Sequence, residues 1–326
     1  MHRQSRVRLV MVAPCYCPIC HSTEEKVWRC KTTLVFGTEY DFLECPLCGV
    51  FYFSPLPTVA QLTRAYSAAY YTFDRWREEG KGMVFARRLQ RWKARGKLLD
   101  VGCATGFFLH GIQQHSQWDV YGIDFGPSAV HFARTQLGLN VQGGNLADVH
   151  FPANYFDYVH VNNVLEHVLN PLELLQECYR VIKPDGMVYL AVPNGFVDSR
   201  DLIAFYNEEQ LPARSHQRHI FFFQKHTLLY IFDKIGFAIT KKQTSGWKRG
   251  LRSVGKFPKK SDWKTGYYPC TTPEQSVLEG DITLRAHKPP LPAWYHSYRF
   301  WQGHLHRIAG LHNIGLNFLF LLRANK

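Results

Sequence analysis

Long apolar runs are missing from this sequence of 326 residues. A helix that crosses a bilayer needs about 20 consecutive, mostly apolar residues, and no window of the sequence provides them. The apolar run over residues 7–13 is barely long enough for the core of a secretion signal, and Arg8 interrupts it. The missing runs exclude a membrane-spanning protein, and we expect the protein to be cytoplasmic.

Acidic residues are also scarce, since 26 of them stand against 39 basic residues and give a formal charge of +13. The excess is concentrated between Lys241 and Lys264, where nine basic residues are accompanied only by Asp262. Such a patch attracts phosphates on nucleic acid, on nucleotide-linked substrates or on anionic lipid. A solvated basic loop explains it equally well. The charge is therefore compatible with a phosphate-bearing partner without identifying one.

The nine cysteines do not form an even set for disulfide pairing, and most lie within the first 48 residues. Two C-x-x-C motifs occur there, at 17–20 and 45–48, with 24 residues between them. Zinc prefers four thiolates in a tetrahedron, and each motif supplies two from a tight turn. The sequence therefore predicts a structural Zn²⁺ with no position open for water, bound by Cys17, Cys20, Cys45 and Cys48. Cys15 could replace Cys17, and Cys30 is unassigned.

From Lys97 onward, apolar strands alternate with helical stretches, which predicts a doubly wound α/β fold with a parallel sheet covered on both faces. The apolar strand at 98–101 runs into the turn Gly102-Cys103-Ala104-Thr105-Gly106, and a helical stretch follows. Glycines at such a turn let the backbone approach a ligand, and the helix amino terminus offers unpaired amides.

Two acidic residues accompany this turn. Asp100 lies at the end of the first strand, where a carboxylate can face the α-amino group of a bound amino acid. Asp124 ends the next strand, 22 residues after Gly102, where it can accept hydrogen bonds from both ribose hydroxyls. A nicotinamide cofactor could use the second acid as well, so these residues predict an adenosine ligand without naming it.

Further motifs follow in order, and together they resemble class I S-adenosylmethionine-dependent methyltransferases. The motifs are Gly144-Asn145-Leu146, Phe151-Pro152, residues 156–159, residues 164–168 with Pro171, residues 181–187, residues 218–223, residues 235–237 and residues 280–289. The two C-x-x-C motifs, the aromatic strand at 50–54, the P-x-P-T at 55–58 and the pair Tyr70-Tyr71 are similar to the front end of many bacterial small-molecule methyltransferases. The resemblance covers Cys17 to about Pro289. It is strongest toward the ubiquinone O-methyltransferase-like group and the zinc-ribbon sugar methyltransferases.

This resemblance implies a Rossmann-like methyltransferase sheet preceded by a small zinc ribbon, with S-adenosylmethionine as the cofactor. The residues that it assigns to the cofactor are Asp100, Gly102, Ala104, Gly106, Asp124, Phe125, Asn145, Leu146 and Asn162. Two of them depart from the usual pattern. Ala104 replaces the middle glycine, and Asn145 stands where an aspartate usually lies near the adenine amino group. A side-chain carbonyl can still accept that hydrogen bond, so we expect weaker binding rather than none.

Methyl transfer needs alignment of donor and acceptor, and a hydroxyl or amine acceptor must also lose a proton. Glu166 and His167 follow the strand that ends near Asn162, so they are expected on a helix at the carboxyl edge of the sheet. We take Glu166, His167 and His219 as candidate catalytic residues. The alternative is that Glu166 and His167 only anchor the helix and that His219 is a structural histidine.

The same helix would place Asn163, Glu166 and His167 on one face, at positions i, i+3 and i+4. Ubiquinone O-methyltransferases have an acid at the first of these positions, and some bind a divalent metal there. Asparagine at position 163 weakens that expectation for this chain.

The expected domains are a zinc ribbon over 1–60, a helical connector over 61–95, a methyltransferase domain over 96–289 with a lid at 193–218, and an aromatic helical extension over 290–326. The helix at 294–322 could touch an anionic membrane or pack on its own domain or on a second subunit. The sequence therefore predicts methyl transfer to a sugar, a nucleotide-linked sugar or a phenolic metabolite. RNA methylation and a non-catalytic, zinc-stabilised binding module are the alternatives.

Overall fold

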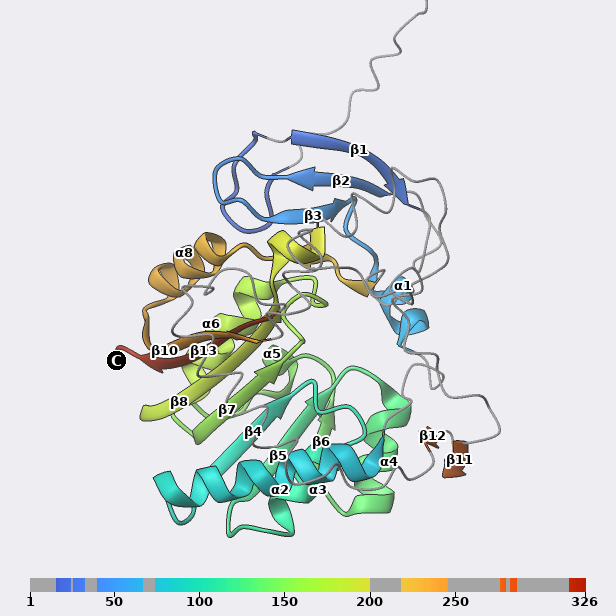
Figure 1. Ribbon diagram of the computed structural model, residues 1–326, viewed down its shortest axis with the longest axis vertical. Coiled ribbons are helices and arrows are strands. Elements are labelled where there is room, and N and C mark those ends of the chain that lie inside the picture. The colour runs from blue at the N-terminus through green and yellow to red at the C-terminus, as the bar shows by residue number, and fades with distance from the viewer. Residues whose placement is uncertain are drawn as a thin grey trace, which may run out of the picture.

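The computed structural model describes residues 16–24, 26–32, 40–66, 74–199, 218–245, 276–279, 282–285 and 317–326. A small antiparallel sheet near the amino terminus lies against one end of a larger α/β body (Figure 1). Most of the predicted lid and most of the basic stretch, at 200–217 and 246–264, lie outside the described residues.

The small sheet is shared by both parts of the chain. Its order is β1 (Lys26–Thr32), β2 (Tyr40–Glu44), β3 (Phe51–Ser54) and β9 (Phe221–Phe222). The last of these strands comes from the α/β body, and its residue Phe222 pairs with Phe51. The ring of Phe222 meets those of Phe42 and Phe53 edge-on, with centroids 5.2 and 5.7 Å apart. Aromatic packing therefore joins the amino-terminal module to the α/β body.

Two helices follow the small sheet, within the region predicted as a helical connector. Helix α1 (Val59–Ala65) begins with a capping box in which Thr58 and Gln61 satisfy each other's backbone amides. Helix α2 (Arg75–Trp92) is capped by Asp74, whose side chain accepts from the amide of Arg77.

The large sheet has seven strands, in the order β10-β13-β8-β7-β4-β5-β6. The strands are β4 (Lys97–Val101), β5 (Asp119–Asp124), β6 (Asn140–Gly143), β7 (Phe156–Asn162), β8 (Ile182–Pro193), β10 (Phe237–Ser245) and β13 (Asn317–Ala324). The strands from β8 to β6 are parallel, whereas β13 is antiparallel to both of its neighbours. The expected Rossmann-like α/β fold is confirmed, with a mixed rather than a fully parallel sheet.

The helices cover both faces of this sheet (Figure 1). They are α3 (Phe107–Gln113), α4 (Pro127–Leu137), α5 (Leu146–Val149), α6 (Pro171–Val181) and α8 (Lys225–Ile235). Successive residues of β4 point to opposite faces, so Leu98 packs in the core formed with α2, α3 and α4, and Leu99 packs in the core formed with α6 and α8. Asp100 therefore lies on the face of Leu98.

The prediction of a helical carboxyl-terminal extension is wrong for its last part. Residues 317–324 form β13, in which Phe318, Phe320 and Leu322 are buried at alternate positions. This is the period of a strand rather than of a helix. The motif at 280–289, which resembles the final strand of the family, does contain a strand, β12 (Ile282–Arg285). Among the described residues this strand pairs with β11 (Ser276–Glu279) in a separate hairpin and is not part of the large sheet. The predicted membrane-contacting part at 294–316 lies outside the described residues.

Among the residues that the structure describes, none of the helices combines the length and the apolar character needed to span a membrane.

Candidate functional site

The four predicted zinc ligands lie together. The Sγ atoms of Cys17 and Cys48 are 3.6 Å apart and those of Cys20 and Cys45 are 3.5 Å apart. All four sulfurs lie within 4.8 Å of one another, and the four cysteines are free thiols. A tetrahedral Zn²⁺ with Zn–S bonds of about 2.3 Å would separate its sulfurs by about 3.8 Å. The cluster therefore has the size and the chemistry of a four-thiolate zinc site.

Backbone amides hold both turns of the cluster through hydrogen bonds. The amide of Ile19 donates to Cys17 Sγ at 3.5 Å, and Gly49 closes the second turn by donating to the carbonyl of Cys45 at 2.8 Å. Gly49 has a φ of +72°, and a Cβ on it would overlap the ring of His226. The hydrogen bond between Cys17 and Cys48 lowers the pKa of Cys17 and raises that of Cys48, so a metal bound by all four thiolates would displace protons from the cluster.

The glycine-rich turn after β4 has the conformation that its sequence predicts. Gly102 and Gly106 have φ values of +72° and +79°, and Ala104 has a φ of +50°. The left-handed region costs a non-glycine residue about 1–2 kcal/mol, so Ala104 is held there by its surroundings. The amides of Gly102 and Cys103 both donate to the carbonyl of Ile123 in β5. The turn is therefore tied to the neighbouring strand.

The carboxylate of Asp124 also holds the glycine-rich turn through a hydrogen bond. Its Oδ2 accepts from the amide of Ala104 at 2.7 Å, and its Oδ1 accepts from the amide of Gly126 at 2.8 Å. Burial, and then the charges of Asp124 and Asp100, raise the pKa of the Cys103 thiol well above its usual range. Both predicted cofactor carboxylates are therefore close to the turn, as expected for neighbouring strand ends.

The other predicted cofactor residues differ in how far they are buried. Leu146 is buried, Phe125 is half-buried, and Asn162 is exposed at the end of β7. Asn145 caps α5, and its Nδ2 donates to Asp148 Oδ2 at 3.0 Å. An acidic side chain, Asp148, is thus hydrogen-bonded to the asparagine that stands in place of the usual aspartate.

Residues 163–168 form a turn, so the prediction of a helix there is wrong. Asn163 has a φ of +55°, which an α-helix does not allow, and α6 starts only at Pro171, after the Asn170 cap. The side chain of Asn163 accepts from Asn317 Nδ2 of β13 at 3.2 Å. Asn163, Glu166 and His167 therefore do not share a helical face.

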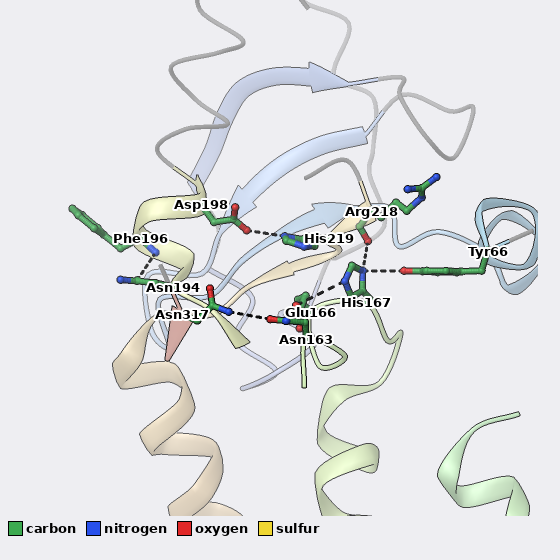
Figure 2. A network of polar contacts seen from close by, with 10 residues as sticks. All are labelled: Tyr66, Asn163, Glu166, His167, Asn194, Phe196, Asp198, Arg218, His219 and Asn317. Atoms are coloured by element: carbon green, nitrogen blue, oxygen red, sulfur yellow. Dashed lines mark hydrogen bonds and ion pairs between the residues drawn. The ribbon is translucent and has the colours of Figure 1, made fainter. Parts of the chain in front are cut away.

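The turn nevertheless brings together all three predicted catalytic residues. Figure 2 shows Glu166 and His167 facing His219, which comes from the segment before β9. The His167 and His219 ring centroids are 4.8 Å apart, and His167 Nε2 lies 3.8 Å from Glu166 Oε1. One ligand atom from each residue lies within 4.8 Å of the others, so the set could also hold a cation. We call Glu166, His167 and His219 the acid–histidine cluster.

Both histidine rings of the cluster are held through Nδ1. His219 Nδ1 lies 2.7 Å from Asp198 Oδ2. His167 Nδ1 donates to the carbonyl of Arg218 at 3.0 Å and lies 2.9 Å from the hydroxyl of Tyr66. Because a carbonyl only accepts hydrogen bonds, Nδ1 of His167 carries the hydrogen. In the neutral ring, the Nε2 lone pair is therefore on the side of Glu166.

Burial gives the three groups different pKa values. It raises the pKa of Glu166 to about 7, because the side chain is 1% exposed and neither carboxylate oxygen has a hydrogen-bond partner among the described residues. Burial, followed by the nearby His219, lowers the pKa of His167 to about 3. Burial alone would lower the pKa of His219, but the charge and hydrogen bond of Asp198 outweigh it and raise that pKa. Near neutral pH, His167 is therefore neutral, and Glu166 is the group that gains or loses a proton.

Sequence reasoning missed two members of this network. Asp198 lies in the predicted lid, where residues 194–199 are largely buried, and Gly195 is so close to Phe222 that a Cβ would lie 2.5 Å from its backbone. Tyr66 lies at the end of α1, 101 residues before His167 in the chain. No spacing in the sequence indicated either contact.

Asp198→Asn is expected to lower the pKa of His219 to below the ordinary value of 6.5. The substitution removes the charge that opposes burial and keeps a side-chain oxygen for the hydrogen bond. Titration of the His219 ring protons by NMR measures the change, and the exposed Asp233→Asn is the control. An unchanged His219 pKa would contradict the assigned cause.

Comparison with known proteins agrees with this geometry. The family described as "Methyltransferase domain" matches residues 73–242, which is 170 of the 326 residues. The chain is 29% identical to the ubiquinone biosynthesis O-methyltransferase of Neisseria meningitidis serogroup A over 109 residues, 30% of this chain and 44% of that protein. It is 30% identical to the Aliivibrio fischeri (strain MJ11) enzyme of the same name over 148 residues, 42% of this chain and 62% of that protein. The chain thus spans about half the length of these curated relatives.

Solved structures include a SAM-dependent methyltransferase from Archaeoglobus fulgidus, with 17% identity and a TM-score of 0.40 over 74% of this chain and 94% of that one. The family match covers the glycine-rich turn, both strand-end acids and the turn with Glu166 and His167. The chain therefore belongs to the methyltransferase domain family.

Proposed function

We propose that this enzyme methylates a hydroxyl group of a small phenolic or sugar-like acceptor, and that the acid–histidine cluster removes the hydroxyl proton. One contact carries the proposal. A Cβ on Gly102 would lie 2.4 Å from Val164 Cγ2, so the turn that bears Glu166 packs directly on the glycine-rich turn. A proton acceptor thereby adjoins the place where the methyl donor would bind.

The residues around the glycine-rich turn fit the groups of S-adenosylmethionine. Asp100 would accept from the α-amino group and Asp124 from the ribose hydroxyls. Gly102, Ala104 and Gly106 would provide the close backbone approach, and the amino terminus of α3 follows them. The adenine would lie against the remaining assigned residues, Phe125, Asn145, Leu146 and Asn162. When bound, the cofactor supplies a methyl group on a positively charged sulfur.

Within the cluster, Glu166 is the best candidate for the general base. A pKa of about 7 lets it accept a proton near neutral pH. His167 is a weak base because its pKa is about 3, so its role would be to orient the acceptor through Nε2. His219, whose pKa is raised by Asp198, would stabilise the ionised form of Glu166 whenever its ring is protonated.

The acceptor class follows from the need to remove a proton and from the curated relatives, which are named as O-methyltransferases of ubiquinone biosynthesis. A phenolic hydroxyl fits both. Sugar hydroxyls remain in the proposal because the amino-terminal four-cysteine module is similar to that of zinc-ribbon sugar methyltransferases. We assign a structural Zn²⁺ to that module, since four thiolates leave no open position for chemistry.

The acceptor is tested by tritium transfer from labelled S-adenosylmethionine to polyhydroxybenzoates, nucleotide sugars, and tRNA and rRNA. We expect label in a phenol or a sugar. Transfer to RNA only, with binding that weakens steeply as salt rises, would reject the proposal in favour of an RNA substrate. If a chelator stops turnover and a divalent cation restores it, proton removal would be assigned to a metal at the cluster and not to Glu166.

Asp124→Ala is expected to weaken binding of S-adenosylhomocysteine, measured by calorimetry, by at least about a hundredfold. The reason is that two hydrogen bonds to a charged acceptor are lost, each contributing about 1.5–3 kcal/mol. The exposed Asp119, at the other end of the same strand, provides the control Asp119→Asn. Normal binding by Asp124→Ala would show that the cofactor residues are assigned wrongly.

A further inference from the structure

A histidine–aspartate pair is buried beneath the glycine-rich turn. His160 of β7 and Asp100 of β4 are direct neighbours in the parallel ladder. His160 Nδ1 donates to Asp100 Oδ1 at 2.7 Å. The residues are 7% and 4% exposed, respectively. Because an ionised carboxylate only accepts, the hydrogen of this bond belongs to His160.

The ring of His160 is fixed by packing. It stacks on Phe108 of α3, with centroids 4.7 Å apart and planes at 26°, and on Tyr189 of β8, at 5.0 Å and 9°. Phe85 of α2 meets it edge-on at 5.5 Å. A ring clamped on both faces has one orientation, so its Nδ1 holds Asp100 Oδ1 at one place.

Asp100 depends on this contact. Burial of an ionised carboxylate is unfavourable unless the group is paired or hydrogen-bonded. Among the described residues, no lysine or arginine forms an ion pair with Asp100, and its side chain is hydrogen-bonded to His160. Asp100 lies two residues before Gly102. Because its Oδ1 is occupied by His160, its Oδ2 is the oxygen that remains for a ligand.

We propose that His160 is a positioning residue, which aims Asp100 at the α-amino group of S-adenosylmethionine. The inference rests on the proposed function, in which Asp100 receives that group. It makes His160 part of cofactor recognition, although its ring is stacked between aromatic side chains and lies one strand away. If His160 only filled the core, its substitution would weaken the binding of all cofactor-site ligands equally, with or without an α-amino group.

Two ligands separate these roles. S-adenosylhomocysteine carries the α-amino group, whereas methylthioadenosine has the same nucleoside without the amino-acid part. We expect His160→Leu in the full chain to weaken binding of S-adenosylhomocysteine by about ten- to a hundredfold. Binding of methylthioadenosine should change by less than about threefold. His160→Asn, whose amide can donate in place of Nδ1, should recover most of the loss.

Calorimetry with both ligands measures the effect, and Tyr189→Phe is the control that preserves the stack and the hydrogen bond. Equal losses for both ligands, or no loss for either, would overturn the role of His160. If His160→Leu does not fold, His160→Phe, which keeps an aromatic ring between Phe108 and Tyr189 but has no donor, gives the same ligand comparison. Wild-type chain that binds neither ligand would instead reject the proposed cofactor site, so the two failures are distinguishable.

Discussion

Glu166→Gln is expected to stabilise the folded protein at pH 8 and to lower methyl transfer by about 10²- to 10⁴-fold. Burial raises the pKa of this carboxyl from 4.5 to about 7. Glutamine has nearly the same shape and no charge, so it removes both the cost of burying a carboxylate and the capacity to accept a proton.

The stability effect has a definite sign and pH window. Below pH 4.5 the carboxyl is protonated in both states, and its neutral form is buried without the cost of a charge. Between pH 4.5 and about 7 the folded state keeps a proton that the unfolded state has released, so the free energy of unfolding falls as pH rises. This interval corresponds to about 3 kcal/mol. The advantage of glutamine should therefore be small at pH 4.5 and nearly complete at pH 8.

Urea unfolding at both pH values measures this difference, with the exposed Glu173→Gln as the control. Methyl transfer is measured with whichever acceptor takes up label in the tritium assay. An advantage of glutamine that is equal at the two pH values would contradict a raised pKa. Full activity in the variant would remove Glu166 from the role of base.

Cys45→Ser is expected to open the amino-terminal sheet and to abolish binding of one Zn²⁺ per chain. Binding of structural zinc contributes about 10–16 kcal/mol to folding in small zinc modules. The loss of one thiolate from a cluster whose sulfurs lie within 4.8 Å should therefore unfold the module. Metal analysis and hydrogen exchange of β1, β2 and β3 measure the two effects.

Unfolding of the amino-terminal module should disturb the acid–histidine cluster and leave the glycine-rich turn intact. Strand β3 pairs with β9, and the amide of Ile220 donates to the carbonyl of Glu166 at 2.7 Å. We expect normal affinity for S-adenosylhomocysteine together with reduced methyl transfer. Cys178→Ala, which removes a buried thiol of the α/β body, should retain the zinc. Zinc retained by Cys45→Ser would refute the ligand set.

Local sequence patterns were sufficient to predict several features of the fold and of the candidate sites. The spacing of two C-x-x-C motifs predicted the four-cysteine cluster, and strand-to-helix alternation predicted the doubly wound α/β fold. Glycines at 102 and 106 indicated a turn at which the backbone can approach a ligand, and both have positive φ angles. Each of these features depends on residues close together in the chain, or on a period that one segment displays by itself.

Contacts between distant segments were not predictable in this way. Strand β13 enters the sheet from residues 317–324, because pairing with β8 and β10 overrides an aromatic composition that also suits a helix. Tyr66 and Asp198 reach the histidines of the cluster from α1 and from the residues after β8. The sequence by itself determined which residues could bind the cofactor and the metal and which could accept a proton. Only the tertiary structure singled out Glu166 as the proposed base, because its raised pKa depends on burial by segments far apart in the chain.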